Sequence, residues 1–236
     1  MNDHEVPITI GGVPIPADLK RHHVLLTGAP ATGKTVAIRE MLRAIRLRGD
    51  AAVIYAPMDE LRDLYDPARD LIVNPGDPRH QPDVPVGDLD GRFVFLTHNM
   101  GDDMSPARTC HARLIERVVA QTAHATPVWL VLDELPHGLP RDAIEAALAE
   151  GSGVTVIAAA QFLGHLQAHG YEALWAVPRT RLTLCIREPE TAKLVASELG
   201  VEPSIIMTLP TLTGYLTLRM EGGLSLKTDV QLEVEE

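Results

Sequence analysis

Residues Gly28 to Thr35 read GAPATGKT and match the pattern G-x-x-x-x-G-K-[ST] over its full length. The apolar run HVLLT precedes this segment, and the helical pattern TVAIREMLRAI follows it. In such a loop, glycines let backbone N–H groups surround phosphate oxygens, the lysine reaches the β and γ phosphates, and the hydroxyl can bind Mg²⁺. The pattern therefore predicts that ATP and Mg²⁺ bind at these residues: Gly28, Ala29, Pro30, Ala31, Thr32, Gly33, Lys34 and Thr35. The alternative is a glycine turn with an incidental Lys-Thr, which seldom reproduces so long a pattern.

Carboxylates and an amide follow two other apolar runs. VWLVLDE places Asp133 and Glu134 at the end of a predicted buried strand. Parallel sheets bind ligands at the carboxyl ends of their strands, so Asp133 is predicted to hold Mg²⁺, and Glu134 is predicted to activate a water as general base. VTVIAAAQ ends in Gln161, which we expect beside the γ-phosphate as a sensor. The alternative for Gln161 is an ordinary amide that faces solvent.

The elements that must position these residues alternate between short apolar runs and longer amphipathic stretches, which is typical of a parallel sheet flanked by helices. Most of the runs are nearly continuous in Val, Ile and Leu, as in strands buried on both faces. Strands are predicted at 23–27, 51–56, 71–73, 92–97, 128–132, 154–160 and 180–186, and helices at 34–47, 106–123, 140–150 and 190–199. Residues 214–220 and 224–227 predict a terminal β-hairpin, with an acidic, frayed tail over 228–236. The Pro-, Gly- and Asp-rich stretch 74–91 is predicted to be a surface loop.

Composition limits the classes of protein that fit. A chain of 236 residues without a linker suits one domain, and its two cysteines cannot form a disulfide framework or a four-thiolate zinc site. No apolar stretch is long enough to span a membrane, and we expect a cytoplasmic protein. The net charge of −11 argues against a protein that coats nucleic acid non-specifically. A DNA-binding role would need a local basic patch, and Arg39, Arg43 and Arg46 share one helix face; that face is either such a patch or an ordinary solvated surface.

With these motifs placed, the chain resembles the TraD/TrwB-like coupling proteins of conjugative type IV secretion systems, which are RecA-like ATPases of the FtsK/HerA group. ITIGGVPIPADLKRHHVLLTG, within a lead-in over residues 1–22, resembles the segment before the family's phosphate loop, and LVLDELPHGLP resembles its D-E-L-P segment. RLRGDAAVIYAP, DLYDPARDLIVNPGDPR, AAAQFLGHLQAHGYEALWA, RTRLTLCIREPETAKLVASELG and LPTLTGYLTLRMEGGLSLK are similar to further family segments in the same order. The resemblance implies a RecA-like α/β ATPase with a C-terminal β-hairpin.

Three departures from the family pattern shape what we expect. The family has an N-terminal transmembrane hairpin that we do not expect here, and it inserts an all-helical domain where this chain has only the loop 74–91. The resemblance also implies an arginine finger about eleven residues before Gln161, where this chain has Glu150. A carboxylate cannot stabilise charge on a transferring phosphoryl group, so we expect slow turnover unless another arginine reaches across a subunit interface. The candidates for that arginine are Arg141, Arg179 and Arg181.

Two functions follow from the resemblance. One is a reduced DNA-translocation motor that forms a homo-oligomeric ring with ATP at subunit interfaces. The other is a slow or non-hydrolysing ATP-dependent module that docks onto a secretion or relaxase component, at the periphery of an inner-membrane complex. The intact pair Asp133 and Glu134 favours the first, and Glu150 with the acidic surface favours the second.

Overall fold

The computed structural model describes residues 6–16, 22–57, 60–87, 89–98, 104–121, 127–133, 139–219 and 225–234. Its strands are β1 (Thr9–Ile10), β2 (Val13–Pro14), β3 (Val24–Thr27), β4 (Ala51–Tyr55), β5 (Leu71–Val73), β6 (Phe93–Leu96), β7 (Val128–Leu132), β8 (Val154–Ala160), β9 (Thr180–Thr183), β10 (Thr213–Arg219) and β11 (Ser225–Gln231). Its α-helices are α1 (Lys34–Leu47), α2 (Met104–Ala120), α3 (Arg141–Leu148), α4 (Leu163–Ala168), α5 (Ala173–Ala176), α6 (Pro189–Leu199) and α7 (Pro203–Met207), and Arg62–Leu64 forms a 3₁₀ turn, η2.

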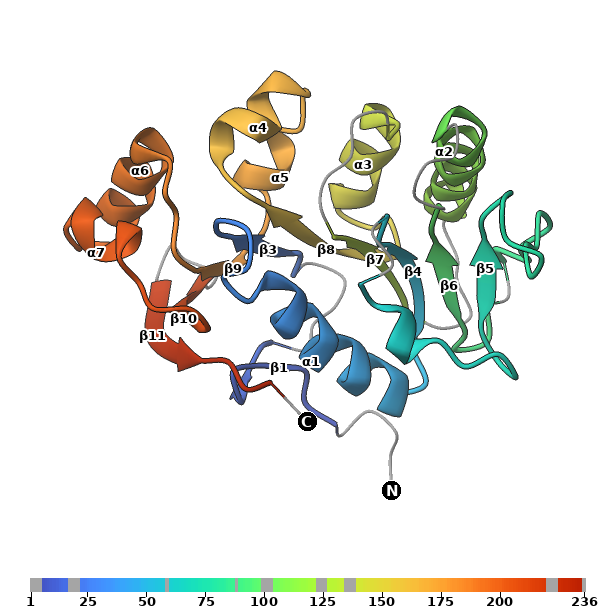
Figure 1. The fold of residues 1–236 in the computed structure, drawn as a ribbon, viewed down its shortest axis with the longest axis horizontal. Helices are drawn as coiled ribbons and strands as arrows, with labels where there is room; N and C mark the ends of the chain where they lie inside the picture. The colour runs from blue at the N-terminus through green and yellow to red at the C-terminus, as the bar shows by residue number, and fades with distance from the viewer. Residues whose placement is uncertain are drawn as a thin grey trace.

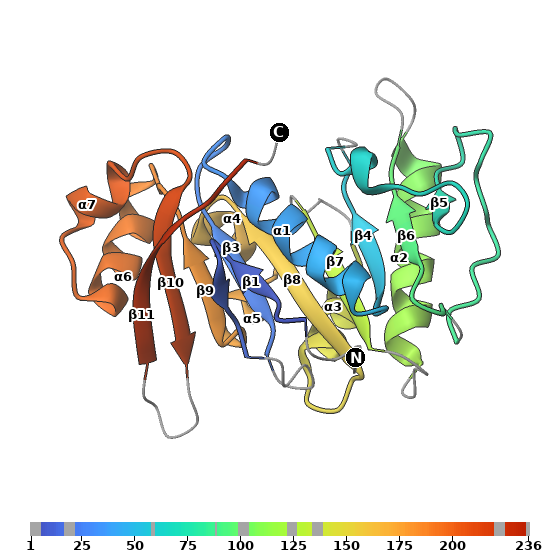
Figure 2. The same cartoon turned by 90° about the horizontal axis from the view of Figure 1, so that it is seen from below.

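One nine-stranded sheet organises the molecule, in the order β11-β10-β9-β3-β8-β7-β4-β6-β5. From β9 to β5 all neighbouring strands are parallel, whereas β10 and β11 are antiparallel. Helices α2 to α7 lie along one face, and α1 with the β1–β2 hairpin covers the other (Figure 1). The view from below shows α1 in front of the sheet (Figure 2). The predicted α/β architecture is therefore correct, and each predicted strand and long helix is present.

The two faces of the sheet carry separate hydrophobic cores because the central strands are buried on both sides. One core joins alternate strand residues such as Leu130 and Val156 to α2, α3 and the α4–α5 region. The other joins Leu26, Val131 and Ile157 to α1 and the β1–β2 hairpin. This two-sided burial explains why the strands read as continuous apolar runs rather than alternating ones.

The loop predicted over residues 74–91 follows β5 and leads back toward β6. Most of its described residues are exposed, as expected, but Val84 and Leu89 are buried in the core beneath α2. Arg117 on α2 donates a hydrogen bond to the carbonyl oxygen of Val84 at 3.1 Å. The loop is thus anchored at two points on the sheet's helical layer.

The segment after Lys227 differs from its prediction as a frayed tail. Residues through Gln231 continue β11, pairing with β10 down to Thr213, and the N–H of Leu232 donates to the carbonyl of Leu212 at 2.8 Å. Sequence reasoning failed here because the two buried residues, Val230 and Leu232, are isolated between acids and exposed polar residues. Their partners lie on α1, β1 and the loop before β10, far away in the chain.

We predict that Leu232→Ala lowers the free energy of unfolding by about 2–5 kcal/mol, because truncating a fully buried leucine leaves a cavity. Leu232 is 1% exposed, whereas Val234, two residues on, is 64% exposed. Urea denaturation of the two variants Leu232→Ala and Val234→Ala measures the effect. Equal, small changes for both would contradict the packing of the C-terminal segment.

No helix among the described residues is both long and apolar enough to cross a membrane.

A buried histidine makes the fold sensitive to pH. His111 on α2 is 1% exposed, its Nε2 lies 2.7 Å from the carbonyl oxygen of Val73, and its ring meets Tyr55 edge-on. Burial lowers the pKa of His111 from 6.5 to about 4, against the opposing effect of the Val73 hydrogen bond. Between these two values the unfolded chain binds more protons than the folded chain, so stability is complete above pH 6.5 and falls toward pH 4.

We therefore predict that wild-type protein loses on the order of 3 kcal/mol of unfolding free energy between pH 7 and pH 4 through His111 alone. His111→Asn, which can still donate to Val73, should flatten this part of the profile. The partly exposed His169 provides the matched variant His169→Asn. Urea titrations across this range test the prediction, and an unchanged slope in His111→Asn would refute it.

Candidate functional site

The predicted phosphate loop connects β3 to α1 at the carboxyl edge of the sheet. Its first two residues are fixed by neighbouring strand ends: Gly28 N–H donates to Ala160 O at 3.1 Å, and Ala29 N–H donates to Cys185 O at 2.7 Å. The Thr32 hydroxyl closes the loop by donating to Ala29 O at 2.8 Å. The loop is therefore held between the ends of β8 and β9.

Two glycines of the motif are required by close packing. A Cβ at Gly28 would lie 2.6 Å from the Thr32 hydroxyl and 2.8 Å from Leu184. Gly33 has a φ of 118°, and a Cβ there would lie 2.9 Å from both Leu212 and Leu232. Residues on either side of the terminal hairpin thus pack directly against the phosphate loop, and a larger residue at Gly33 would collide with them.

The N-terminus of α1 is available to an anion. Gly33 is its N-cap, no side chain caps it, and no acid occupies its first turn. By contrast, Glu188 caps α6 by accepting hydrogen bonds from the N–H groups of Glu190 and Thr191. Because uncapped N–H groups and the helix dipole both favour negative charge, α1 provides an anion site where α6 does not.

Lys34 and Thr35 begin α1 and face the loop and the next strand end. The Lys34 ammonium is buried and donates to Gly28 O at 2.8 Å and Ala29 O at 3.0 Å, so it lies over the hollow of the loop. The Thr35 hydroxyl lies 3.1 Å from Asp133 Oδ2. Asp133 is buried at the end of β7, where its N–H donates to Tyr55 O at 2.9 Å. The structure therefore brings the predicted residues of the loop and Asp133 together.

Sequence reasoning missed one further carboxylate, Glu60. Its Oε2 accepts a hydrogen bond from the Thr35 hydroxyl at 3.3 Å. Glu60 follows β4, which neighbours β7 in the sheet, so the carboxyl edge of β4 was the available signal. One hydroxyl and two carboxylates form a set of hard oxygen donors, the kind that suits Mg²⁺ held jointly with phosphates. No group of three or more acidic, histidine or cysteine side chains suited to a metal occurs among the described residues.

The other residues singled out from the sequence are Gln161 and Glu134, expected at the γ-phosphate, and Glu150, at the position implied for the finger. Gln161 directly follows Ala160, the residue whose carbonyl holds Gly28, and its side chain is partly exposed. Its strand end is therefore next to the phosphate loop, as the sensor prediction requires. Glu134 lies outside the described residues. Glu150 is exposed in the turn after α3.

The three candidates for the arginine finger differ in how deeply they are buried. Arg181 is enclosed in β9: its guanidinium donates to Glu198 Oε2 at 2.8 Å and to the carbonyl oxygen of Trp175. A side chain held in this way cannot reach a neighbouring subunit, so Arg181 is wrong as a candidate finger. Arg141 is exposed and pairs with Glu145 at 2.8 Å, and Arg179 is partly exposed.

Two of the arginines on one face of α1 form ion pairs with acidic residues of the segment after β4. Arg39 pairs with Asp63 at 2.9 Å, and Arg46 pairs with Asp70 at 2.6 Å while lying over the Phe93 ring. These arginines therefore hold the 60–70 segment against α1. Their ion pairs reduce the positive charge that this face can offer to DNA.

Comparisons with known proteins agree with this geometry. Residues 7–112 match the family described as "Type IV secretion-system coupling protein DNA-binding domain". No curated protein matches in sequence. The unbound bacterial conjugative coupling protein TrwBdeltaN70 has a TM-score of 0.82 at 19% identity, covering 98% of this chain and 90% of that one.

Two ligand-bound structures are also similar. Plasmid coupling protein TrwB with a non-hydrolysable ATP analogue gives a TM-score of 0.81 at 20% identity, over 98% of this chain and 90% of that one. The genome packaging NTPase B204 of Sulfolobus turreted icosahedral virus 2, with AMPPCP, gives 0.54 at 13% identity, over 90% and 100% of the two chains. At such identities these matches establish the fold, which is the predicted RecA-like α/β fold with C-terminal antiparallel strands. By sequence over residues 7–112 and by fold, the chain is therefore similar to the type IV secretion-system coupling proteins.

Proposed function

We propose that this chain is a Mg²⁺-dependent ATP-binding module of a conjugative coupling apparatus and that it hydrolyses ATP. The observation that carries the proposal is the contact between the Thr35 hydroxyl and Asp133 beside the uncapped N-terminus of α1. TrwB, which has this fold, has been crystallised with ADP and Mg²⁺ and with an ATP analogue, and this supports the same ligands here.

Different groups of the chain would bind the phosphates and the Mg²⁺ ion. The N–H groups of the loop and of the first turn of α1 would receive phosphate oxygens, and Lys34 would exchange its two carbonyl acceptors for the β and γ phosphates. Thr35 and Asp133 would hold Mg²⁺, with Glu60 close enough to orient a water in its shell. Bound Mg²⁺ would neutralise charge that develops on the phosphates.

Hydrolysis also needs groups at the γ-phosphate. We assign Glu134 as the base that accepts a proton from the attacking water, and Gln161 as the side chain that reports the γ-phosphate to β8. An arginine from a neighbouring subunit would complete the site, and the exposed Arg141 and partly exposed Arg179 are the remaining candidates. A ring with ATP at its subunit interfaces is the assembly that supplies such an arginine.

A second function, ATP-dependent docking without turnover, has its own support. Glu150 occupies the position where the family resemblance implies the finger, and Arg181 is locked by Glu198. The net charge of −11 and the ion pairs of Arg39 and Arg46 also weaken the case that this domain moves DNA by itself. In this role the module would dock onto a secretion or relaxase component when ATP is bound.

One experiment separates the two functions. ATP turnover is measured over a range of protein concentrations, with no DNA, with single-stranded DNA and with double-stranded DNA. A motor gives a rate that rises steeply with protein concentration and with DNA, whereas a switch binds Mg–ATP at micromolar concentration with a flat, near-zero rate. Failure to bind Mg–ATP at all would contradict both functions.

A further inference from the structure

Strand β11 is the outermost strand at one end of the nine-stranded sheet. Figure 1 shows it beside β10, at the end of the sheet where α6 and α7 lie. All of its residues are exposed except Val230. An exposed edge strand presents backbone N–H and C=O groups that can pair with a strand of another chain.

Hydrogen bonds around the β10–β11 hairpin decide which residues of β11 face the free edge. Arg219 N–H donates to Arg179 O at 2.8 Å, so the odd-numbered residues of β10 direct their backbone groups toward β9. Leu232 N–H donates to Leu212 O at 2.8 Å, so the even-numbered residues of β10 and β11 face each other. The odd-numbered residues of β11 therefore direct their backbone groups outward, and they are Ser225, Lys227, Asp229 and Gln231.

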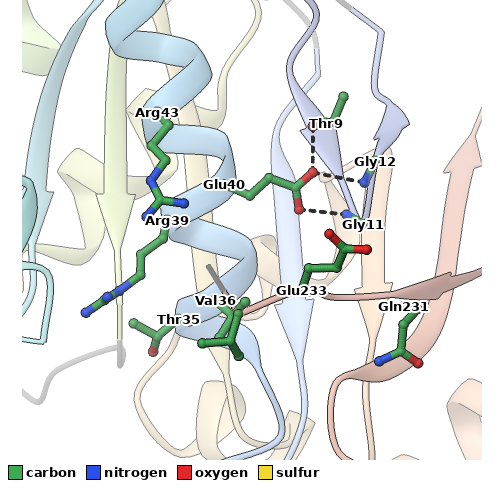
Figure 3. A pocket seen from close by; sticks show the side chains of 11 residues that line it. Thr9, Gly11, Gly12, Thr35, Val36, Arg39, Glu40, Arg43, Gln231 and Glu233 are labelled. Atoms are coloured by element: carbon green, nitrogen blue, oxygen red, sulfur yellow. Dashed lines mark hydrogen bonds between the residues drawn. The ribbon is translucent and has the colours of Figure 1, made fainter. Parts of the chain in front are cut away.

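The β1–β2 hairpin limits this edge at the carboxyl end of β11. Glu40 holds the hairpin turn by accepting hydrogen bonds from the N–H groups of Gly11 and Gly12, and the turn lies near the chain that carries Gln231 (Figure 3). A Cβ at Gly11 would lie 3.0 Å from Gln231 O. The part of the edge that stays open to another chain is therefore residues 225–229.

Charge selects one way in which two copies of this edge can pair. In an antiparallel pair of β11 strands, outward residues must lie opposite outward residues, so the registers that overlap most of the strand have two-fold axes at Lys227, Thr228 or Asp229. The first sets two lysines opposite each other, and the last sets two aspartates opposite each other. Like charges directly opposite are destabilising. An axis at Thr228 instead sets Lys227 opposite Asp229 of the second copy, once on each side of the axis.

The same axis also covers an exposed apolar side chain. Leu226 is 51% exposed, and it points to the same face of the sheet as the buried Val230, because strand residues alternate between faces. An axis at Thr228 places Leu226 opposite Val230 of the second copy. This cross-strand contact removes part of the Leu226 side chain from water, which favours association.

The two charged side chains are able to form cross-strand ion pairs. Lys227 Nζ donates to Leu199 O at 3.1 Å and lies 5.2 Å from the centroid of the Tyr215 ring, so the ammonium is held close to the sheet. An ammonium has three donors, so it can serve a carboxylate as well. Within the part of the chain that the structure describes, the Asp229 carboxylate forms no hydrogen bond or ion pair.

We propose that two copies of this chain associate through β11 as an antiparallel pair with its two-fold axis at Thr228. An uncharged partner strand would leave Lys227 and Asp229 unpaired, so their charges favour a second copy over an unrelated strand. The contact is isologous, unlike a ring contact in which an arginine of one subunit reaches the ATP of another, and it does not rest on the proposed function. Because the open edge is short, we expect a weak, concentration-dependent dimer.

Disulfide formation by Thr228→Cys in the absence of nucleotide tests the axis. In the proposed pair the two copies of residue 228 are directly opposite in a non-hydrogen-bonded position, where Cα atoms lie about 4.5 Å apart, within disulfide range. We expect Thr228→Cys to form a disulfide dimer at least about tenfold faster than Leu226→Cys, whose two copies would lie several residues apart on the same face. Wild-type protein, with Cys110 and Cys185, gives the background. Equal rates for the two variants would overturn the proposal.

Charge reversal tests the register independently. Asp229→Lys sets lysine opposite Lys227, and we expect the dissociation constant of the dimer, measured by analytical ultracentrifugation, to rise by at least about tenfold. The double variant Lys227→Glu, Asp229→Lys restores opposite charges and should recover the dimer. Asp83→Lys, in the exposed part of the 74–91 loop, is the matched control and should leave the dissociation constant unchanged.

Two results of this comparison count against the pairing. Wild-type protein that stays monomeric at every concentration contradicts it, and so does a dimer that Asp229→Lys leaves intact. Lys227→Glu also removes the contact with Leu199, so thermal unfolding of each variant separates lost pairing from lost fold. If the double variant unfolds, Asp229→Lys and the disulfide rates still decide the question.

Discussion

Lys34→Ala should reduce ATP turnover by at least about a hundred- to a thousandfold and weaken nucleotide binding by at least about tenfold. The Lys34 ammonium is buried over the loop, where it donates to the carbonyl oxygens of Gly28 and Ala29. Alanine cannot place positive charge at that point, so phosphates would meet only backbone donors and the helix dipole. Coupled-assay kinetics and calorimetry with an ATP analogue measure the two losses.

The matched control is Lys193→Ala, which removes the same charge from an exposed position on α6, where Lys193 pairs with Glu190. Lys34→Ala also removes a buried hydrogen-bond donor, so its melting temperature must be measured beside its activity. Wild-type turnover by a folded Lys34→Ala protein would overturn the assignment of the phosphate loop.

The phosphate site could be predicted from sequence because its determinants are local. The loop Gly28–Thr35 is a continuous segment, and the strand and helix that flank it have clear apolar patterns. The contact between Thr35 and Asp133 followed from a general property of parallel sheets, whose strand ends meet at one edge. Placing Thr35 and Asp133 required no knowledge of how side chains far apart in the sequence pack together.

Residues whose role depends on distant partners could not be predicted. Glu60 contacts Thr35 only because β4 lies next to β7, an order that the sequence does not state. Leu232 is a single apolar residue in an acidic stretch, and its burial depends on packing against α1 and Leu212. From the sequence, Arg181 was a candidate for the finger arginine. Its ion pair with Glu198 in the folded chain shows that its role is structural.

Asp133→Asn should separate metal binding from nucleotide binding. Asparagine has the same shape, and its Oδ1 can still accept from the Thr35 hydroxyl, which lies 3.1 Å from the native carboxylate. It lacks the negative charge that a hard cation such as Mg²⁺ requires. We therefore expect affinity for ATP in EDTA to stay near wild type, while the gain in affinity on adding Mg²⁺ is lost and turnover falls by about two to four orders of magnitude.

Glu60 is the alternative carboxylate ligand for Mg²⁺, because it also contacts the Thr35 hydroxyl. If Glu60 were the main ligand, Asp133→Asn would keep most of its Mg²⁺ response, and Glu60→Gln would lose it. Asp133 is buried and its backbone is tied to Tyr55, whereas Glu60 is exposed, so we assign the direct contact to Asp133. Asp83→Asn, in the exposed part of the 74–91 loop, removes the same charge away from the site. Titration of Mg²⁺ against turnover and affinity in the three variants identifies which carboxylate binds the metal.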